Sequence, residues 1–230
     1  MCFSKEMSFF NFAILSGYAA YIFNKNPESW RIYVPMMYLG LKDLLQGFLY
    51  VFDDKENYKY VLSVLSYVHI CFQPMIINIF FSYFGTASNI VNIKGYWNII
   101  IIGTFLFGLY ELTNLDVFNI QNTPYCTDKK SDFCSDSNSS YIGKYHVGYK
   151  FRSKGYYNLM LILAMMLPVL LTNAWILSFI WGFFIIGIAI LFNNVRDGEY
   201  GAIWCLLSII PLIPVVYFRN EVSSVLKPAH

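Results

Sequence analysis

Residues 60–84, YVLSVLSYVHICFQPMIINIFFSYF, run without a single Asp, Glu, Lys or Arg. A bilayer core about 30 Å thick needs about 20 apolar residues in a helix to cross it, and this run is longer than that. The stretch therefore predicts a membrane-spanning helix, with two polar side chains and a proline near its centre.

The same criterion, applied outward along the chain, predicts an all-α integral membrane bundle of about seven helices. The other six segments lie at about 9–23, 32–52, 97–112, 157–172, 175–192 and 200–218. Three of them (9–23, 97–112 and 157–172) are marginal in length, so six spans are the alternative. Only Asn173 and Ala174 separate the fifth and sixth segments, which predicts a tight hairpin there.

Composition leads to the same class of protein. Of the 230 residues, 57% are hydrophobic and 13% are charged, whereas soluble domains carry about 25% charged residues. This excludes a soluble monomer and a disordered chain, and a net charge of +2 gives no reason to expect nucleic acid as a partner. We expect one polytopic domain over residues 1–230 with the lipid bilayer as its partner; other membrane subunits or a second copy remain open.

Aromatic residues near the ends of the segments fit the same expectation. The last six segments each have a Tyr or Trp near an end, among them Trp30, Trp97 and Trp175. Such rings favour the headgroup layer, where one edge is apolar and the other is wet.

The longest polar stretch, residues 119–156, lies between the fourth and fifth segments. It contains Cys126 and Cys134, and the glycosylation sequon that begins at Asn138. Two cysteines beside a sequon indicate a disulfide, a glycan and an oxidising, non-cytosolic side of the membrane. The alternative is two free thiols and a chance sequon.

This loop sets the predicted orientation. With seven spans the N-terminus shares the non-cytosolic side with the loop, and the C-terminus is cytosolic. The Lys and Arg distribution does not decide the matter. Six of the ten basic residues on the loop's side belong to the loop itself, and the remaining segments split four to five.

Two charges lie inside the second segment. Lys42 and Asp43 are followed by Gln46, and a charge in hydrocarbon costs about 2.5–3.5 kcal/mol on insertion scales. Neighbours on a helix point about 100° apart, so we expect at least one of the two charges to meet another helix. An ion pair that fixes helix packing and a functional polar pathway are both compatible with them. Glu111 lies close enough to the end of the fourth segment to reach the interface.

Near the centre of residues 60–84, His69 and Gln73 lie four positions apart and so on one helix face. Pro74 removes a backbone donor, which frees the carbonyl of Ile70 and predicts a kink. Asn78 joins the pair only if that kink rotates the second half of the helix. The pair could line a proton or solute path, with His69 titrating near neutral pH, or it could hold helices together by hydrogen bonds.

The last segment is preceded by Glu199, where the dipole of a helix N-terminus stabilises a carboxylate. That segment contains no lysine, which excludes a retinal Schiff base there. The three histidines are His69, His146 and His230, with no HxxxH or HExxH pair among them. A zinc site would therefore need carboxylate or cysteine ligands, and both metal and cofactor stay undetermined.

Three short motifs occur between the third and the last segment. They are His69-x-x-x-Gln73-Pro74, Gly143-Lys144-Tyr145-His146 and Glu199-x-x-x-Ile203-Trp204-Cys205-x-x-Ser208. In these motifs the chain resembles an uncharacterised multi-pass membrane family, a domain of unknown function. The resemblance implies a compact bundle of about seven helices with no established activity. It singles out Gln73, Glu199, Trp204 and the histidines at 69 and 146.

We therefore expect a polar intramembrane site built from Asp43, His69, Gln73 and Glu199, with a role in transport, as a channel or in ligand sensing. The secondary candidates are Lys42, Asn78, Glu111, His146 and Trp204. Two alternatives come from other classes. One is a membrane-embedded lipid hydrolase, possible with or without metal, that uses the histidines at 69 and 146 with a carboxylate. The other is a structural or assembly subunit of a membrane complex.

Overall fold

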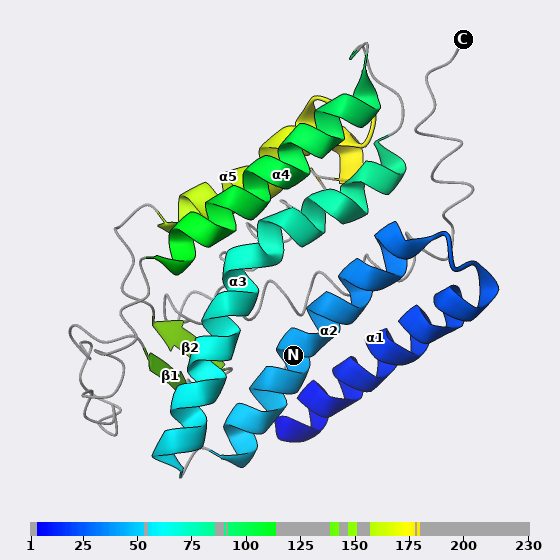
Figure 1. The fold of residues 1–230 in the computed structure, drawn as a ribbon. Helices are drawn as coiled ribbons and strands as arrows, with labels where there is room; N and C mark the ends of the chain where they lie inside the picture. The colour runs from blue at the N-terminus through cyan, green and yellow to red at the C-terminus, as the bar shows by residue number, and fades with distance from the viewer. Residues whose placement is uncertain are drawn as a thin grey trace.

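The computed structural model describes residues 4–52, 55–85, 90, 92–113, 139–142, 147–150, 157–177 and 179. Within these ranges the chain forms five α-helices and one two-stranded antiparallel sheet (Figure 1). The helices are α1 (Lys5–Lys25), α2 (Trp30–Val51), α3 (Glu56–Phe84), α4 (Ile93–Leu112) and α5 (Tyr157–Leu170), and the strands are β1 (Ser139–Ile142) and β2 (Val147–Lys150).

The five helices coincide with the first five predicted segments, and their ends differ from the predicted ends by a few residues. The strand pair within the 119–156 loop was not predicted. Two helical stretches, Asn57–Phe84 and Ile93–Leu112, are long and apolar enough to cross a membrane by length and composition. This finding does not establish seven spans. The sixth segment beyond Phe179 and the whole seventh lie outside the described residues.

The helices α1 and α2 form a closely packed hairpin. Residues three or four apart form the buried stripe of α1, which consists of Ser8, Asn11, Leu15, Ala19 and Ile22. Two glycines of α2 face this helix. A Cβ at Gly40 would lie 3.3 Å from the Cβ of Leu15, and one at Gly47 would lie 3.0 Å from the ring of Phe9. The missing side chains therefore allow the two backbones to come close.

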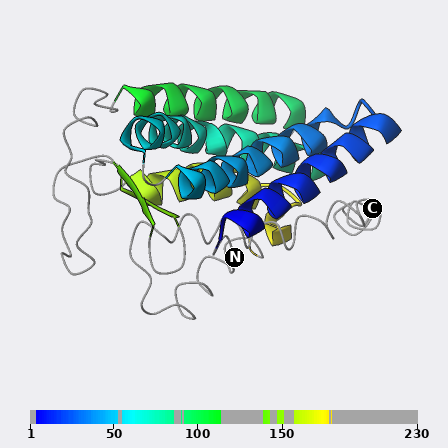
Figure 2. The same ribbon diagram turned by 90° about the horizontal axis from the view of Figure 1, so that it is seen from below.

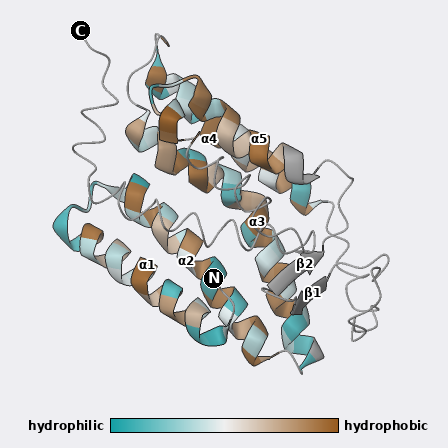
Figure 3. Ribbon diagram, turned by 180° about the vertical axis from the view of Figure 1, so that it is seen from behind, coloured by the Kyte–Doolittle hydropathy of each residue, from teal (hydrophilic) through white to brown (hydrophobic). Residues whose placement is uncertain are grey.

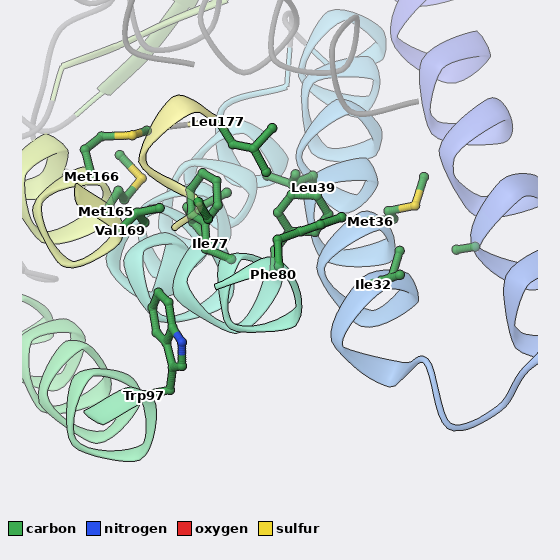
Figure 4. Close-up of a cluster of buried hydrophobic side chains, with 14 of the residues drawn as sticks. Ile32, Met36, Leu39, Ile77, Phe80, Trp97, Met165, Met166, Val169 and Leu177 are labelled. Atoms are coloured by element: carbon green, nitrogen blue, oxygen red, sulfur yellow. The ribbon is translucent and has the colours of Figure 1, made fainter. Parts of the chain in front are cut away.

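Helix α3 is the centre of the bundle and contacts α2, α4 and α5. Figure 2 shows it between α4 on one side and the α1–α2 hairpin on the other. The main apolar cluster forms around its second half (Figure 4), where Ile77 and Phe80 pack with residues of the neighbouring helices. These neighbours include Met36 and Leu39 of α2, Trp97 of α4, and Met165 and Val169 of α5.

Pro74 lies inside α3, and Figure 1 shows this helix changing direction about halfway along its length. The predicted kink is therefore present. A proline at this place removes one backbone hydrogen bond and pushes against the carbonyl four residues earlier, which bends the helix.

A tight turn follows α5, as the short spacing between the fifth and sixth segments predicted. The N–H of Thr172 donates to the carbonyl of Val169, and the N–H of Trp175 donates to that of Thr172. The hydroxyl oxygen of Thr172 also accepts a bond from the N–H of Ala174. Helical conformation resumes at Trp175.

Candidate functional site

Helix α2 buries three polar side chains together with apolar ones such as Met36 and Leu39, and its outer face is apolar. Lys42 and Asp43 are each 3% exposed, and Gln46 is 1% exposed. The outward positions recur every three, four or seven residues and are Val34, Met37, Leu41, Phe48 and Val51. A helix on the surface of a water-soluble protein shows the reverse arrangement.

His69 of α3 is held against α2 by a reciprocal pair of hydrogen bonds. Its Nε2 donates to the carbonyl of Tyr38 over 2.7 Å, and the hydroxyl of Tyr38 donates to the carbonyl of His69 over 2.6 Å. The two rings are also stacked, with their centroids 4.0 Å apart. Since a carbonyl only accepts, Nε2 carries the hydrogen. Nδ1 is buried and has no hydrogen-bond partner within the described part of the chain.

Lys42 lies one helical turn beyond Tyr38 on α2 and therefore on the same face of the helix. Both Lys42 and Asp43 have interactions within the protein. Their burial is therefore compensated, as buried charges require.

Gln73 follows His69 by one turn and is 2% exposed, with an interaction of its own. Gln46 differs, because neither Nε2 nor Oε1 has a hydrogen-bond partner among the described residues. We call Lys42, Asp43, Gln46, His69 and Gln73 the polar layer, by which we mean the buried polar side chains of these two helices; because α2 and α3 are antiparallel, Gln46 and Gln73 lie on opposite sides of the Tyr38–His69 contact. It is contributed by two helices that pack against each other, α2 and α3.

Asn78 is directed away from the polar layer. Its Nδ2 donates to the carbonyl of Pro74 over 2.8 Å and to that of Ala164 in α5 over 2.9 Å. The carbonyl of Ala164 would normally bond to the N–H of residue 168, but Pro168 has none. Asn78 therefore supplies the donor that α5 lacks, and it links α3 to α5 instead of joining His69.

Two side-chain hydrogen bonds connect α3 and α4, one near each end of α4, and each is donated to a backbone carbonyl. The hydroxyl of Tyr67 donates to the carbonyl of Glu111 over 2.7 Å, at the C-terminal end of α4. Nε1 of Trp97 donates to the carbonyl of Gly85 over 2.7 Å, at the end of α3. Trp97 is 4% exposed and packs in the core, so its ring is covered by protein; its expected position at headgroup depth stays a prediction. Trp30 and Trp175 are exposed.

Sequence reasoning left two residues out of the site, Tyr38 and Gln46. Together with Lys42 they follow a spacing of four residues along α2, so all three share one face. This spacing was the available signal, but a tyrosine in an apolar helix does not reveal its partner.

Several predicted residues lie outside the described part of the chain. They are Cys126, Cys134, Asn138, His146, Glu199 and Trp204. The disulfide, the glycan and the contribution of His146 and Glu199 to the hydrolase alternative therefore stay predictions. Among the described residues, no three or more His, Cys, Asp or Glu side chains are grouped so that they could hold a metal ion.

Comparison with known proteins gives one match. The model of a family described as a family of unknown function (DUF5765) matches residues 6–226. No curated protein matches the chain, and no solved structure does. The chain thus matches a family of unknown function over nearly its whole length, while the three motifs and the seven-helix bundle that the resemblance implies stay predictions.

Proposed function

Since the chain belongs to the DUF5765 family, whose function is unknown, we propose its role from its own residues. It is an integral membrane protein whose helices face lipid on the outside and handle a small polar solute at the polar layer. Transport is the activity that this arrangement serves most directly, with a channel or a ligand sensor as its variants.

The exposed surface of the helices supports the membrane part of the proposal. On α4 the most exposed large side chains are Ile99, Ile102, Leu106 and Tyr110. This helix has 20 residues, a length of about 30 Å at 1.5 Å per residue, which is close to the thickness of a bilayer core. Figure 3 shows hydrophobic residues along α4 and α5 and hydrophilic ones at the α1–α2 turn and at the start of α3.

The two ends of α2 also support the membrane part of the proposal, because a basic side chain lies over an aromatic ring at each end. At its start the guanidinium of Arg31 lies 5.5 Å from the ring centre of Trp30. Just after its end the ammonium of Lys55 lies 5.5 Å from that of Phe52 and 5.8 Å from that of Tyr58. Aromatic and basic residues together are typical of the two headgroup levels of a membrane. The 22 residues of α2 span about 33 Å between these levels.

We extend the proposal to seven spans, with the N-terminus and the 119–156 loop on the non-cytosolic side. Strand β1 contacts α3 and β2 contacts α2, which supports placing this loop on the side of the α2–α3 connection. Expression in microsomes tests the orientation. We expect a mobility shift that is removed by deglycosylation and absent in Asn138→Gln.

The observation that carries the functional part is the burial of Lys42 and Asp43 in a helix that is apolar outside. Ionisable residues at such positions are costly and mark substrate, ion or proton pathways in membrane proteins. We propose that Asp43, His69, Gln73 and Glu199 form the site, with Lys42 beside His69. The described members come from α2 and α3, which pack against each other.

Flux measurements in proteoliposomes test this proposal. The panel consists of proton entry, followed with an internal pH dye, and of water, glycerol and urea entry, followed by light scattering. We expect at least one flux to exceed that of protein-free vesicles severalfold, and His69→Ala or Lys42→Met to change it. If all four fluxes equal those of protein-free vesicles, the transport proposal is wrong.

A second candidate, a structural subunit of a membrane complex, is favoured by a specific observation. His69, Asn78 and Tyr67 all use their donors on backbone carbonyls of other helices. Hydrogen bonds of this kind hold membrane helices together. On this alternative, His69→Ala lowers the stability of the protein, and every flux stays at the level of protein-free vesicles.

A further inference from the structure

The described helices fall into two groups. In the first group α1 packs on α2, and in the second group α4 and α5 pack on α3. Glycines let α1 and α2 approach closely at two levels, through Gly40 against Leu15 and through Gly47 against Phe9. The main helix contact between the two groups is that of α2 with α3, and we call this contact the joint.

Side-chain hydrogen bonds connect the helices of the second group at several points. Tyr67 and Trp97 link α3 with α4, and Asn78 links α3 with α5, as described above. The hydroxyl of Tyr96 in α4 also donates to the carbonyl of Pro168 in α5 over 2.6 Å. Bonds of this kind hold membrane helices together, so we expect the second group to move as one body.

The joint is mostly polar on one side of the Tyr38–His69 contact and mostly apolar on the other. Because α2 and α3 are antiparallel, the second half of α2 lies against the first half of α3. The buried polar side chains of these two halves are Lys42, Asp43, Gln46, Ser63 and Ser66. On the other side Gln73 is accompanied by members of the main apolar cluster, among them Met36, Leu39, Ile77 and Phe80. Water can replace the bonds of polar groups but not the packing of apolar ones, so the polar side is the easier side to open.

The β1–β2 hairpin connects the two groups at the polar side of the joint. Strand β1 contacts α3 in the second group, and β2 contacts α2 in the first group. Figure 1 and Figure 2 show the hairpin beside the first half of α3. The strands are paired from Ser139 opposite Lys150 to Ile142 opposite Val147, and the backbone hydrogen bonds of such a pair therefore tie one group to the other.

We propose that the β1–β2 hairpin is a strap that holds the joint closed, and that the two groups move against each other when the strap yields. Movement of this kind between packed helices is a hinge or shear motion. It opens the polar side and gives water access to Lys42, Asp43 and Gln46, while the apolar side stays packed. This inference goes beyond the proposed function, because the strap acts on the helices whichever solute the protein handles.

Distances between pairs of spin labels test the strap. They are measured by pulsed electron spin resonance on the full chain in a bilayer, in a background with the native cysteines replaced by alanine. The first pair lies within the first group, the second pair within the second group, and the third pair spans the joint. The labelled side chains are all exposed, and the pairs are Phe10 with Val34, Leu65 with Ile99, and Val51 with Leu106.

The double substitution Gly148→Pro and Tyr149→Pro breaks the strap. Adjacent residues of a strand direct their N–H groups to opposite sides, so one of the two prolines removes a hydrogen bond of the ladder. The matched control is Gly148→Ala with Tyr149→Phe, which keeps both N–H groups. We expect one narrow distance for each pair in the parent and in the control. In the proline variant the Val51–Leu106 distance should shift to a longer value or gain a second, longer one, while the other two pairs keep theirs.

Three other results would each overturn the proposal. An unchanged Val51–Leu106 distance in the proline variant would show that the hairpin does not hold the joint. The same would follow if that distance were already broad in the parent, or if it changed equally in the control. Broadening of all three pairs in the proline variant would show that the helices do not move as two groups.

Discussion

The contact between Tyr38 and His69 is the best-defined polar interaction between α2 and α3. Each residue donates to the carbonyl of the other, and the rings are stacked between these bonds. This arrangement fixes the rotation of α2 and α3 relative to each other at this contact. It leaves only Nδ1 of His69 available on the imidazole.

We expect Tyr38→Phe to lower the free energy of unfolding by about 1 kcal/mol, because it removes one hydrogen bond and keeps the stacked ring. The measurement is unfolding by SDS titration in mixed micelles. Tyr58→Phe is the matched control, since Tyr58 is 56% exposed and its ring contacts do not need the hydroxyl. Equal effects of the two substitutions would contradict the role assigned to the Tyr38 hydroxyl.

For single residues, the sequence predicts which side chains are unfavourable in an apolar segment, but it does not predict which residues they contact. The burial of Lys42 and Asp43 next to another helix follows from the unfavourable free energy of a charge in an apolar segment. The partner Tyr38 does not follow from the sequence, because it depends on the register of α2 against α3. The unpaired amide of Gln46 is equally a property of the packed structure.

Two glycines of α4 show how the helices fit together. A Cβ at Gly108 would lie 2.7 Å from the backbone carbonyl oxygen of Cys71 and 2.9 Å from the ring of Phe72 in α3. A Cβ at Gly103 would have no atom within 4 Å. The approach of α4 to α3 therefore depends on Gly108 and not on Gly103.

Gly108→Ala should destabilise the protein by about 1–3 kcal/mol, since a backbone carbonyl cannot move aside as a flexible side chain does. Gly103→Ala should be neutral or stabilise by up to about 1 kcal/mol through its helix propensity. Unfolding midpoints of the two variants in the same detergent provide the comparison. A larger loss in Gly103→Ala than in Gly108→Ala would rule out the close approach described here.

The link between α3 and α5 permits a double-mutant cycle. Asn78 donates to the carbonyl of Ala164, which Pro168 leaves without its usual partner. We expect Asn78→Leu to cost between about 0.6 and about 1.7 kcal/mol, the average and the largest value measured for such bonds between membrane helices. In a Pro168→Ala background the cost should be smaller, because the substituted residue supplies a backbone N–H of its own. An unchanged cost in that background would show that the two residues are not coupled.

At the scale of elements, the apolar runs predicted the five helices that the structure describes, and Pro74 predicted the bend in α3. The partner of Asn78 could not be predicted in the same way. A proline frees a carbonyl in its own helix, but only the packing of α3 on α5 shows which donor fills it.

For the whole molecule, composition indicated the class of protein, and the structure adds which side of each described helix is buried and which is exposed. Low charge over the chain indicated a membrane protein, but it could not show that α2 buries Lys42, Asp43 and Gln46 and has an apolar outer face. The orientation in the membrane also depends on residues of the 119–156 loop, of which the structure describes only the two strands.

The direct test of this account is the environment of the outer face of α2 in a bilayer. Spin labels are attached singly at Val34, Met37, Leu41 and Phe48, in a background with the five native cysteines replaced by alanine. Collision with dissolved oxygen reports lipid, and collision with a water-soluble nickel chelate reports water. The account predicts high oxygen accessibility and low chelate accessibility at all four positions. High chelate accessibility at these positions would contradict it, because the apolar face of α2 would then lie in water.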